Sequence, residues 1–211
     1  MKKFLLGLAV IAGSFTFAQQ KNSTPVSKSP VRFGIKAGLN VSTMSKESDL
    51  DNYSRKARTG FNAGVFANIP LSSDFSVQPE ILYSQYGNKI NFTDDGDKIY
   101  AKRNLDYITV PVMFQYNVVP NFYLEAGPEF GFKVGSTIKY VNETLNFSVT
   151  STVDDAKGFN LGLGIGAGYY VTPNIGITAR YVAGLTDVIK DNKGGDAIKN
   201  NVFQVGLAYK F

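Results

Sequence analysis

The clearest pattern in the chain begins at residue 31 and reads Val31-Arg32-Phe33-Gly34-Ile35-Lys36-Ala37-Gly38-Leu39-Asn40-Val41. Every second residue is apolar, and the residues between them are basic residues, glycines or an amide. A period of two is typical of a β-strand, because successive side chains of a strand point to opposite faces of the sheet. The sequence therefore predicts a strand with one apolar and one polar face.

Seven further segments repeat this alternation. They predict strands around residues 61–69, 75–83, 108–116, 122–132, 159–169, 175–181 and 203–211. Charged residues avoid the apolar positions and collect on the opposite face, which carries Arg32, Lys36, Glu80, Glu125, Glu129, Lys133, Arg180 and Lys210. Eight two-faced strands predict an all-β fold.

The links between these segments are alternately short and long. Short links fall near residues 70–74, 118–121 and 172–174, and long ones near 43–58, 88–104, 135–157 and 186–200. In an up-and-down barrel this order places the tight turns and both termini at one rim and the long loops at the other. We expect an eight-stranded antiparallel up-and-down transmembrane β-barrel with short periplasmic turns and four longer extracellular loops.

Aromatic residues gather at both ends of the predicted strands. The short-turn ends carry Phe75, Phe114, Tyr116, Phe122, Tyr169, Tyr209 and Phe211, and the long-loop ends carry Phe61, Tyr83, Phe130, Phe132, Phe159, Tyr181 and Phe203. Aromatic girdles mark the two interfaces of membrane barrels, and a terminal Phe resembles the C-terminal signal of bacterial outer-membrane barrels. We expect the apolar face to contact outer-membrane lipid, and the barrel assembly machinery of that membrane to recognise Phe211.

The N-terminus has the pattern of an export signal. Lys2 and Lys3 precede an apolar stretch from Phe4 to Ala12, and the small residue Ala18 ends a cleavage-site pattern. The apolar stretch is shorter than the about 20 residues of a membrane-spanning helix. We predict a signal peptide at residues 1–18, a flexible lead-in at 19–30 and an outer-membrane barrel domain at 31–211.

The composition excludes much of enzyme chemistry. The 211 residues include no Cys and no His, which removes disulfides, thiol nucleophiles, imidazole bases and the usual transition-metal ligands. The formal charge of +5 is dispersed, without the Lys/Arg-rich run typical of a nucleic-acid partner. The chain is therefore predicted not to be an enzyme, with no catalytic residue, cofactor or metal site.

Two local motifs have structural interpretations. Gly162, Gly164 and Ala167 match a dinucleotide-binding G-x-G-x-x-A pattern, but no helix is predicted after them. The glycines more simply leave room for bulky inward neighbours such as Tyr123 or Arg180. The acidic group Asp94, Asp95 and Asp97 lacks the spacing of a calcium loop and, like the stretch 191–196, predicts a solvated turn.

The charged face predicts what fills the lumen. Glu125 and Glu129 share this face at about 13 Å, too far apart for the usual paired carboxylates of a glycosidase. Five basic and three acidic inward residues predict an ion-pair network that plugs the barrel. A narrow path for ions or protons is the alternative.

Three segments resemble a known family. They are Phe33-Gly34-Ile35-Lys36-Ala37-Gly38-Leu39-Asn40, Gln78-Pro79-Glu80-Ile81-Leu82-Tyr83-Ser84 and Tyr107-Ile108-Thr109-Val110-Pro111. Their order and spacing resemble the outer-membrane β-barrel family that includes PorT, over nearly the whole chain after residue 18. Thr109 stands where many members carry an acidic residue, so a role that rests on that acid does not carry over. The resemblance implies an outer-membrane location and an eight-stranded barrel, and PorT itself is linked to export of secreted proteins.

These observations predict a non-enzymatic outer-membrane protein, either a scaffold or a binder through its surface loops. A transport or protein-secretion accessory, or a small pore, is the alternative. A further alternative keeps the strands but inverts their faces, which gives a soluble exported barrel with an apolar, ligand-binding lumen. Envelope or secretion-machine partners fit the first two classes.

Overall fold

The computed structural model describes residues 30–45, 53–94, 97–142, 146–190 and 196–211. The predicted signal peptide and almost all of the predicted lead-in lie outside these residues. Nine strands are present: β1 (Arg32–Met44), β2 (Tyr53–Pro70), β3 (Phe75–Asp94), β4 (Asp97–Val119), β5 (Phe122–Asn142), β6 (Phe147–Thr152), β7 (Phe159–Tyr170), β8 (Ile175–Gly184) and β9 (Asn200–Lys210). In this described part, no helix is long and apolar enough to cross a membrane.

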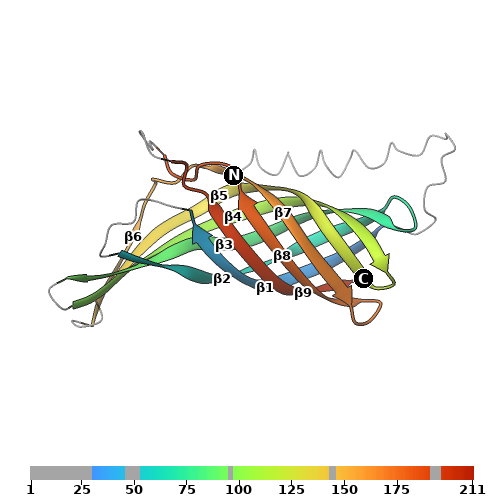
Figure 1. Cartoon of the computed structure of the whole chain (residues 1–211), viewed down its shortest axis with the longest axis horizontal. Coiled ribbons are helices and arrows are strands. Elements are labelled where there is room, and N and C mark those ends of the chain that lie inside the picture. Colours follow the sequence, from blue (N-terminus) through green and yellow to red (C-terminus); the bar gives the residue numbers. More distant parts are fainter. Residues whose placement is uncertain (1–29, 46–52, 95–96, 143–145, 191–195) are drawn as a thin grey trace, which may run out of the picture.

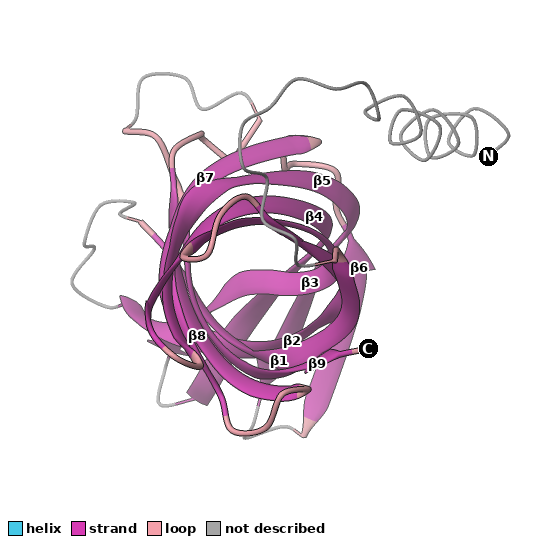
Figure 2. Ribbon diagram, turned by 90° about the vertical axis from the view of Figure 1, so that its right-hand side faces the viewer, coloured by secondary structure: helices cyan, strands magenta, loops and turns pink. Residues whose placement is uncertain are grey.

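The strand pairings close on themselves. Strands β1 to β5 pair in order, β5 pairs with β7, β7 with β8, β8 with β9, and β9 returns to β1. The ring of strands is seen end-on in Figure 2. All pairs are antiparallel, so the expectation of an all-β up-and-down fold is confirmed. Closure pairs the backbone groups that an open sheet would leave unpaired at its edges.

The ninth strand corrects the sequence analysis. Residues 147–152 were expected inside a long loop, but they form β6, which pairs with the end of β5 outside the closed ring. The six residues of β6 are all exposed, so this strand has no apolar burial pattern that a sequence could display. Backbone pairing with an existing edge is what supports it.

A second correction concerns the expected loops 88–104 and 135–157, which are largely strand. β3 and β4 stay paired as far as Asp94 and Asp97, and β5 continues to Asn142. The extensions project from one end of the barrel, at the left of Figure 1. We call residues 53–57, 88–94, 97–104, 135–142 and 147–152 the projecting sheet. Most of its described side chains are exposed or only partly buried, so the strong period-two pattern of the barrel wall is missing here, while ladder hydrogen bonds keep the strands in register.

Burial follows the predicted faces. On the outside, apolar side chains are exposed, among them Phe33, Ile165 and Leu207 at 63%, 58% and 59% of their surface. On the inside, the charged residues Lys36, Glu80, Glu125, Glu129 and Arg180 are buried. The lumen is therefore polar, which is the opposite of the inverted barrel considered as an alternative.

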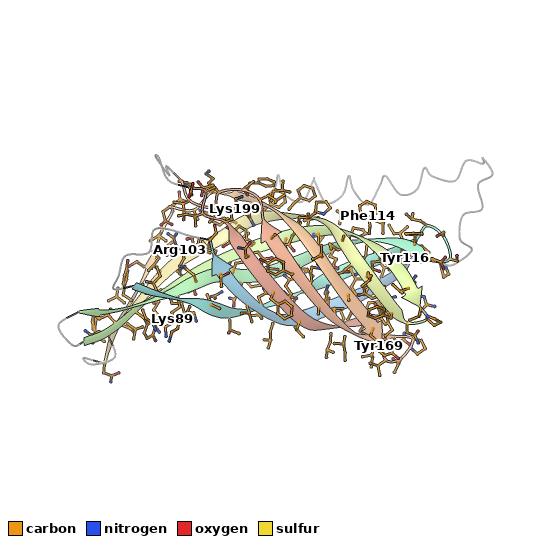
Figure 3. All side chains as sticks on the ribbon, in the orientation of Figure 1. Lys89, Arg103, Phe114, Tyr116, Tyr169 and Lys199 are labelled. Carbon is orange, nitrogen blue, oxygen red and sulfur yellow. The ribbon has the colours of Figure 1, made fainter. Side chains whose placement is uncertain are left out.

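The aromatic residues form paired contacts at both ends of the barrel. At the short-turn end, the ring centroids of Phe75 and Tyr116 are 4.8 Å apart, and Figure 3 shows Phe114, Tyr116 and Tyr169 toward this end. At the other end, Phe132 and Phe159 are 5.7 Å apart. Exposed rings at two levels fit the expected girdles at two interfaces.

The glycines of β7 leave room for side chains of the neighbouring strands. A Cβ atom at Gly168 would lie 2.3 Å from the ring of Tyr123, and one at Gly162 would lie 2.7 Å from Val182 Cγ1. The glycine that makes room for Tyr123 is therefore Gly168, and not Gly162 or Gly164 as predicted; a Cβ atom at Gly164 would lie 3.1 Å from Met113 Cε and 3.5 Å from Arg180 Cδ. A turn and β8 follow β7, and no helix, so the segment lacks the strand-to-helix geometry of a dinucleotide site.

Candidate functional site

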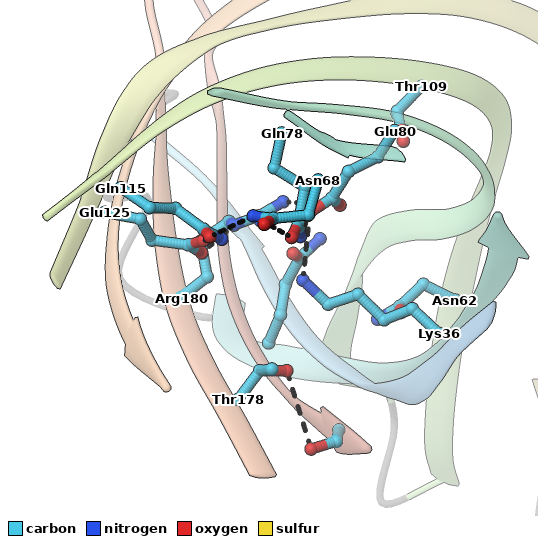
Figure 4. Close-up of polar contacts among 12 residues, drawn as sticks. Lys36, Asn62, Asn68, Gln78, Glu80, Thr109, Gln115, Glu125, Thr178 and Arg180 are labelled. Carbon is cyan, nitrogen blue, oxygen red and sulfur yellow. Dashed lines mark hydrogen bonds and ion pairs between the residues drawn. The ribbon is translucent and has the colours of Figure 1, made fainter. Parts of the chain in front are cut away.

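A buried guanidinium occupies the middle of the lumen. Arg180 of β8 donates from Nη1 to Glu80 Oε2 at 3.0 Å and from Nη2 to Glu80 Oε1 at 2.7 Å. Its Nε donates to Glu125 Oε1 at 2.7 Å. Figure 4 shows Arg180 among side chains from several strands. One cation thus joins β3, β5 and β8 across the barrel, through the fork geometry that makes arginine–carboxylate pairs strong.

Amide side chains donate further hydrogen bonds to the two carboxylates. Gln78 Nε2 donates to Glu80 Oε1 at 3.0 Å, and Gln115 Nε2 donates to Glu125 Oε2 at 3.1 Å. Asn68 Nδ2 in turn donates to Gln115 Oε1 at 2.9 Å. We call Lys36, Glu80, Glu125 and Arg180, with these amides, the lumen network. All are buried, and their mutual contacts compensate for the lost hydration.

The network uses fewer basic residues than the sequence analysis expected. Lys36 joins it through Glu80, at 3.4 Å between Nζ and Oε1. Arg32 and Lys210 instead lie at the short-turn end, and Lys133 bonds to Asp154 at the other end. Period two places a residue on a face but does not give its height along the lumen, which is why all five were grouped together.

Glu129 has a different environment from Glu80 and Glu125. The Tyr86 hydroxyl donates to Glu129 Oε1 at 2.6 Å, and Gln204 Nε2 lies 3.5 Å from the same hydroxyl. Thr109, the position that departs from the family pattern, is buried and shares a hydrogen bond of 3.1 Å with Ser84. A neutral hydroxyl pair therefore takes the place where an acid was expected from the resemblance.

The long-loop end of the lumen is closed by two connections that pack on each other. Ala156, after β6, forms a bridge with Ile189, after β8, and the Lys157 amide donates to the Val188 carbonyl at 2.8 Å. Ala156 and Val188 are fully buried. Ala156 packs in an apolar cluster with Tyr86, Leu105, Tyr107, Val182 and Val202. We call these two connections, residues 153–158 and 185–190, the cap.

Ion pairs hold the cap to the barrel wall. Asp154 accepts from Lys133 Nζ at 2.8 Å and from Lys190 Nζ at 2.7 Å, and Arg103 pairs with Asp155. Hydrogen bonds from Lys133 and then Lys190 lower the pKa of Asp154 to about 2. Asp154 is fully exposed, so solvent screens this contribution.

The lowered pKa of Asp154 predicts that the stability of the cap depends on pH. A carboxyl whose pKa is lowered on folding contributes stability that is complete above its unfolded pKa of about 3.9 and is lost as the pH falls through the folded value. Limited proteolysis of the cap should therefore accelerate between pH 4 and about pH 2 in the native chain. The Asp154→Asn variant should be cleaved faster at neutral pH and show a weaker change over that range. Identical rates at pH 7 would contradict the prediction.

The short-turn end is open. A cavity of about 670 Å³ lies there, lined by polar side chains that include Arg32, Asn68, Gln115, Tyr170 and Lys210. Lys210 Nζ stands 3.7 Å from the centroid of the Tyr170 ring. The cavity ends at Asn68 and Gln115, which belong to the lumen network. The lumen is thus open at one end, occupied by ion pairs in the middle and capped at the other end.

The acidic stretches show no metal site in the part of the chain that the structure describes. No three His, Cys, Asp or Glu side chains gather there closely enough to hold a metal ion. Asp94 and Asp97 pair in register at the end of the β3–β4 hairpin, while Asp95 and most of 191–196 lie outside the described residues.

Comparisons with known proteins agree with this geometry. The family described as outer membrane protein beta-barrel domain matches residues 17–190. None of the curated proteins matches the chain in sequence. Among solved structures, the chain is similar to Ail, the attachment invasion locus protein of Yersinia pestis. The identity is 18% and the TM-score 0.51, and the match covers 85% of this chain and 98% of that chain.

Two further solved structures are similar to the chain. Ail in complex with the heparin analogue sucrose octasulfate matches at 18% identity and a TM-score of 0.50, covering 86% of this chain and 99% of that chain. Neisserial surface protein A matches at 13% identity and a TM-score of 0.44, covering 87% of this chain and 100% of that chain. The two Ail structures show a shared barrel fold.

Proposed function

Because the chain belongs to the family of outer membrane protein beta-barrel domains, and so to the outer membrane, we propose that it is a non-enzymatic barrel with a plugged lumen. Eight strands cross the membrane, with tight turns in the periplasm and the projecting sheet outside the cell. Residues 1–18 direct export and are removed, and Phe211 is the recognition point for barrel assembly. The protein acts through its outer surface, as a scaffold or a binder.

The plugged lumen is the observation that carries this proposal. Arg180, Glu80 and Glu125 join three strands across the middle, and the cap covers the end from which the projecting sheet extends. The interior of an eight-stranded barrel is just wide enough for side chains to fill. A passage would require the ion pairs to open and the cap to move. The exposed projecting sheet is then the part of the molecule that is available to partners.

Single-channel recording tests the plugged lumen. In planar bilayers, the full-length barrel is expected to give no steady conductance steps, because buried ion pairs occupy the middle of the lumen. A porin added at the same protein concentration serves as the positive control for insertion. Steady, reproducible steps from the native chain would contradict the proposal and favour the small pore.

The second candidate function is an accessory role in protein secretion, which the resemblance to the PorT-containing family implies. A plugged barrel is compatible with such a role, because it can hold export subunits through its periplasmic turns without conducting. Co-purification of the full-length chain from outer membranes tests it. Stoichiometric recovery of export subunits would favour this role over a surface binder.

A further inference from the structure

Four lysines stand next to one another across the projecting sheet. Lys56 of β2 pairs with Lys89 of β3, Lys89 pairs with Lys102 of β4, and Lys102 pairs with Lys139 of β5. Directly opposed residues of antiparallel strands have Cβ atoms about 4.5–5.5 Å apart, on one face of the sheet. We call these four residues the lysine row.

Repulsion within the lysine row destabilises the projecting sheet. Like charges placed directly opposite each other destabilise a sheet. Burial, followed by the charges of Arg58, Lys139 and Lys89, lowers the pKa of Lys102. Among the side chains that the structure describes, none of the four lysines forms an ion pair. The row therefore presents positive charge that an external anion could neutralise.

One lysine of the row is held in place. Lys89 Nζ lies 3.7 Å from the centroid of the Tyr100 ring, on the neighbouring strand. A cation over an aromatic face is attracted to it and loses part of its rotamer freedom. Lys89 projects from the sheet in Figure 3, beyond the end of the barrel. Pre-ordering of this kind reduces the entropy that binding must overcome.

The row points away from the axis of the barrel. Asn88, Arg103 and Ile138, which adjoin the row lysines along their strands, line a cavity on the inner side together with Asp155 and Ile189 of the cap. Since successive side chains of a strand alternate between faces, Lys89, Lys102 and Lys139 lie on the outer face. This is the face on which Ile81 and Tyr83 carry the apolar surface of β3. The row is thus continuous with the membrane-facing side.

The row stands above the headgroup layer. Lys89 follows the girdle residue Tyr83 by six positions, or about 20 Å along the strand, and strand tilt reduces the height to about 15 Å. The headgroup region adds only about 5–8 Å to each side of the hydrocarbon core, so the row lies above phospholipid headgroups and at the level of the sugars of a glycolipid. On this outward face, below the tip of the sheet, the nearest anions are the phosphate groups that those sugars carry.

We propose that the lysine row binds the phosphate groups of glycolipid in the outer leaflet, with lipopolysaccharide as its occupant. The inference rests on the proposed function, because it requires the projecting sheet to lie outside the cell. Binding neutralises the repulsion among the four lysines and fixes the barrel in the lipid layer that surrounds it. The row then contributes to how deeply and how firmly the barrel sits in that leaflet.

The test measures binding of fluorescently labelled lipopolysaccharide to the full-length barrel in neutral detergent micelles, by anisotropy. The double variant Lys89→Gln/Lys102→Gln is compared with the native chain. Each lysine near an anionic surface strengthens binding about fivefold, so the variant is expected to bind about 25-fold more weakly. The control Lys157→Gln/Lys199→Gln removes the same charge from connections outside the row and is expected to keep the native affinity.

Two further binding measurements identify the ligand. Enzymatically dephosphorylated lipopolysaccharide is expected to bind the native chain and the row variant equally weakly. Soluble polyphosphate is expected to compete poorly, since it cannot approach as part of a lipid layer. Equal affinities of native chain and row variant for intact lipopolysaccharide would overturn the proposal, and so would soluble polyphosphate that binds as tightly as the glycolipid.

The proposed function is monitored in the same samples by electrophoresis with and without heating. An intact barrel migrates differently before and after boiling. Loss of this shift in the native chain would overturn both the proposed function and the lysine row. A preserved shift with unchanged affinity in the row variant would overturn the row alone. The row variant is expected to be at least as stable as the native chain without glycolipid, because the three opposed lysine pairs are removed.

Discussion

Arg180→Ala is expected to lower the free energy of unfolding of the barrel by about 3–5 kcal/mol, the usual cost of removing one partner from a buried ion pair. The reason is that Glu80 and Glu125 are both buried and both rely on Arg180 for their shortest contacts, at 2.7 Å each. Without the guanidinium, the two carboxylates keep only Lys36 and the amides. Urea unfolding of the full-length chain in neutral lipid vesicles, followed by gel mobility, measures the effect.

Matched variants separate the loss of a partner from the loss of volume. Arg180→Met combined with Lys36→Met, Glu80→Gln and Glu125→Gln removes the charges of the lumen network together and should recover much of the stability, because none of these four positions is left as a buried charge without its partner. Glu80→Ala alone should also destabilise, since it leaves Lys36 without its carboxylate. Unchanged unfolding midpoints for both Arg180→Ala and Glu80→Ala would refute the lumen network.

Ile165→Arg is expected to cost about 2–4 kcal/mol, the range for an arginine on the lipid face near the bilayer midplane. Ile165 lies halfway along β7, with 58% of its surface exposed on the outer face. An exposed position on a soluble barrel would accept arginine at little cost. Folding titrations into lipid vesicles therefore report directly on whether this surface contacts lipid.

Val134→Arg is the depth control. Val134 is equally exposed, at 58%, but lies beyond the girdle residue Phe132 on β5. The cost of a lipid-facing arginine falls to about 0–1 kcal/mol near the interface. Similar costs at both positions would show that depth does not matter and would contradict the membrane-spanning placement.

The closed barrel could be predicted because its signal is local. A strand with water or side chains on one side and lipid on the other must alternate, so Ile35 and Lys36, or Glu80 and Ile81, already reveal which way they face. Alternating link lengths and paired aromatics then follow from a bilayer of fixed thickness. Local pattern and global fold agree in this part of the chain.

The projecting sheet could not be predicted from the sequence, because the backbone pairing that stabilises it leaves no pattern in the amino-acid sequence. Residues such as Lys89, Lys102 and Lys139 read as a polar loop, and nothing in the sequence shows that they meet in register. Once β3, β4 and β5 extend past the barrel, the registers Lys89↔Lys102 and Lys102↔Lys139 place the charges side by side. The candidate binding surface is therefore a product of strand length and register.

The covalent chain alone establishes which residues face inward, which face outward and where strands turn, because each of these depends on neighbours two or a few positions away. It does not establish that Arg180 reaches Glu80 across 100 positions, or that Ala156 and Ile189 meet in the cap. Those contacts depend on the shear and closure of the ring, which set the height of every inward side chain in the lumen. Barrel closure, and not periodicity, decides which charges become partners.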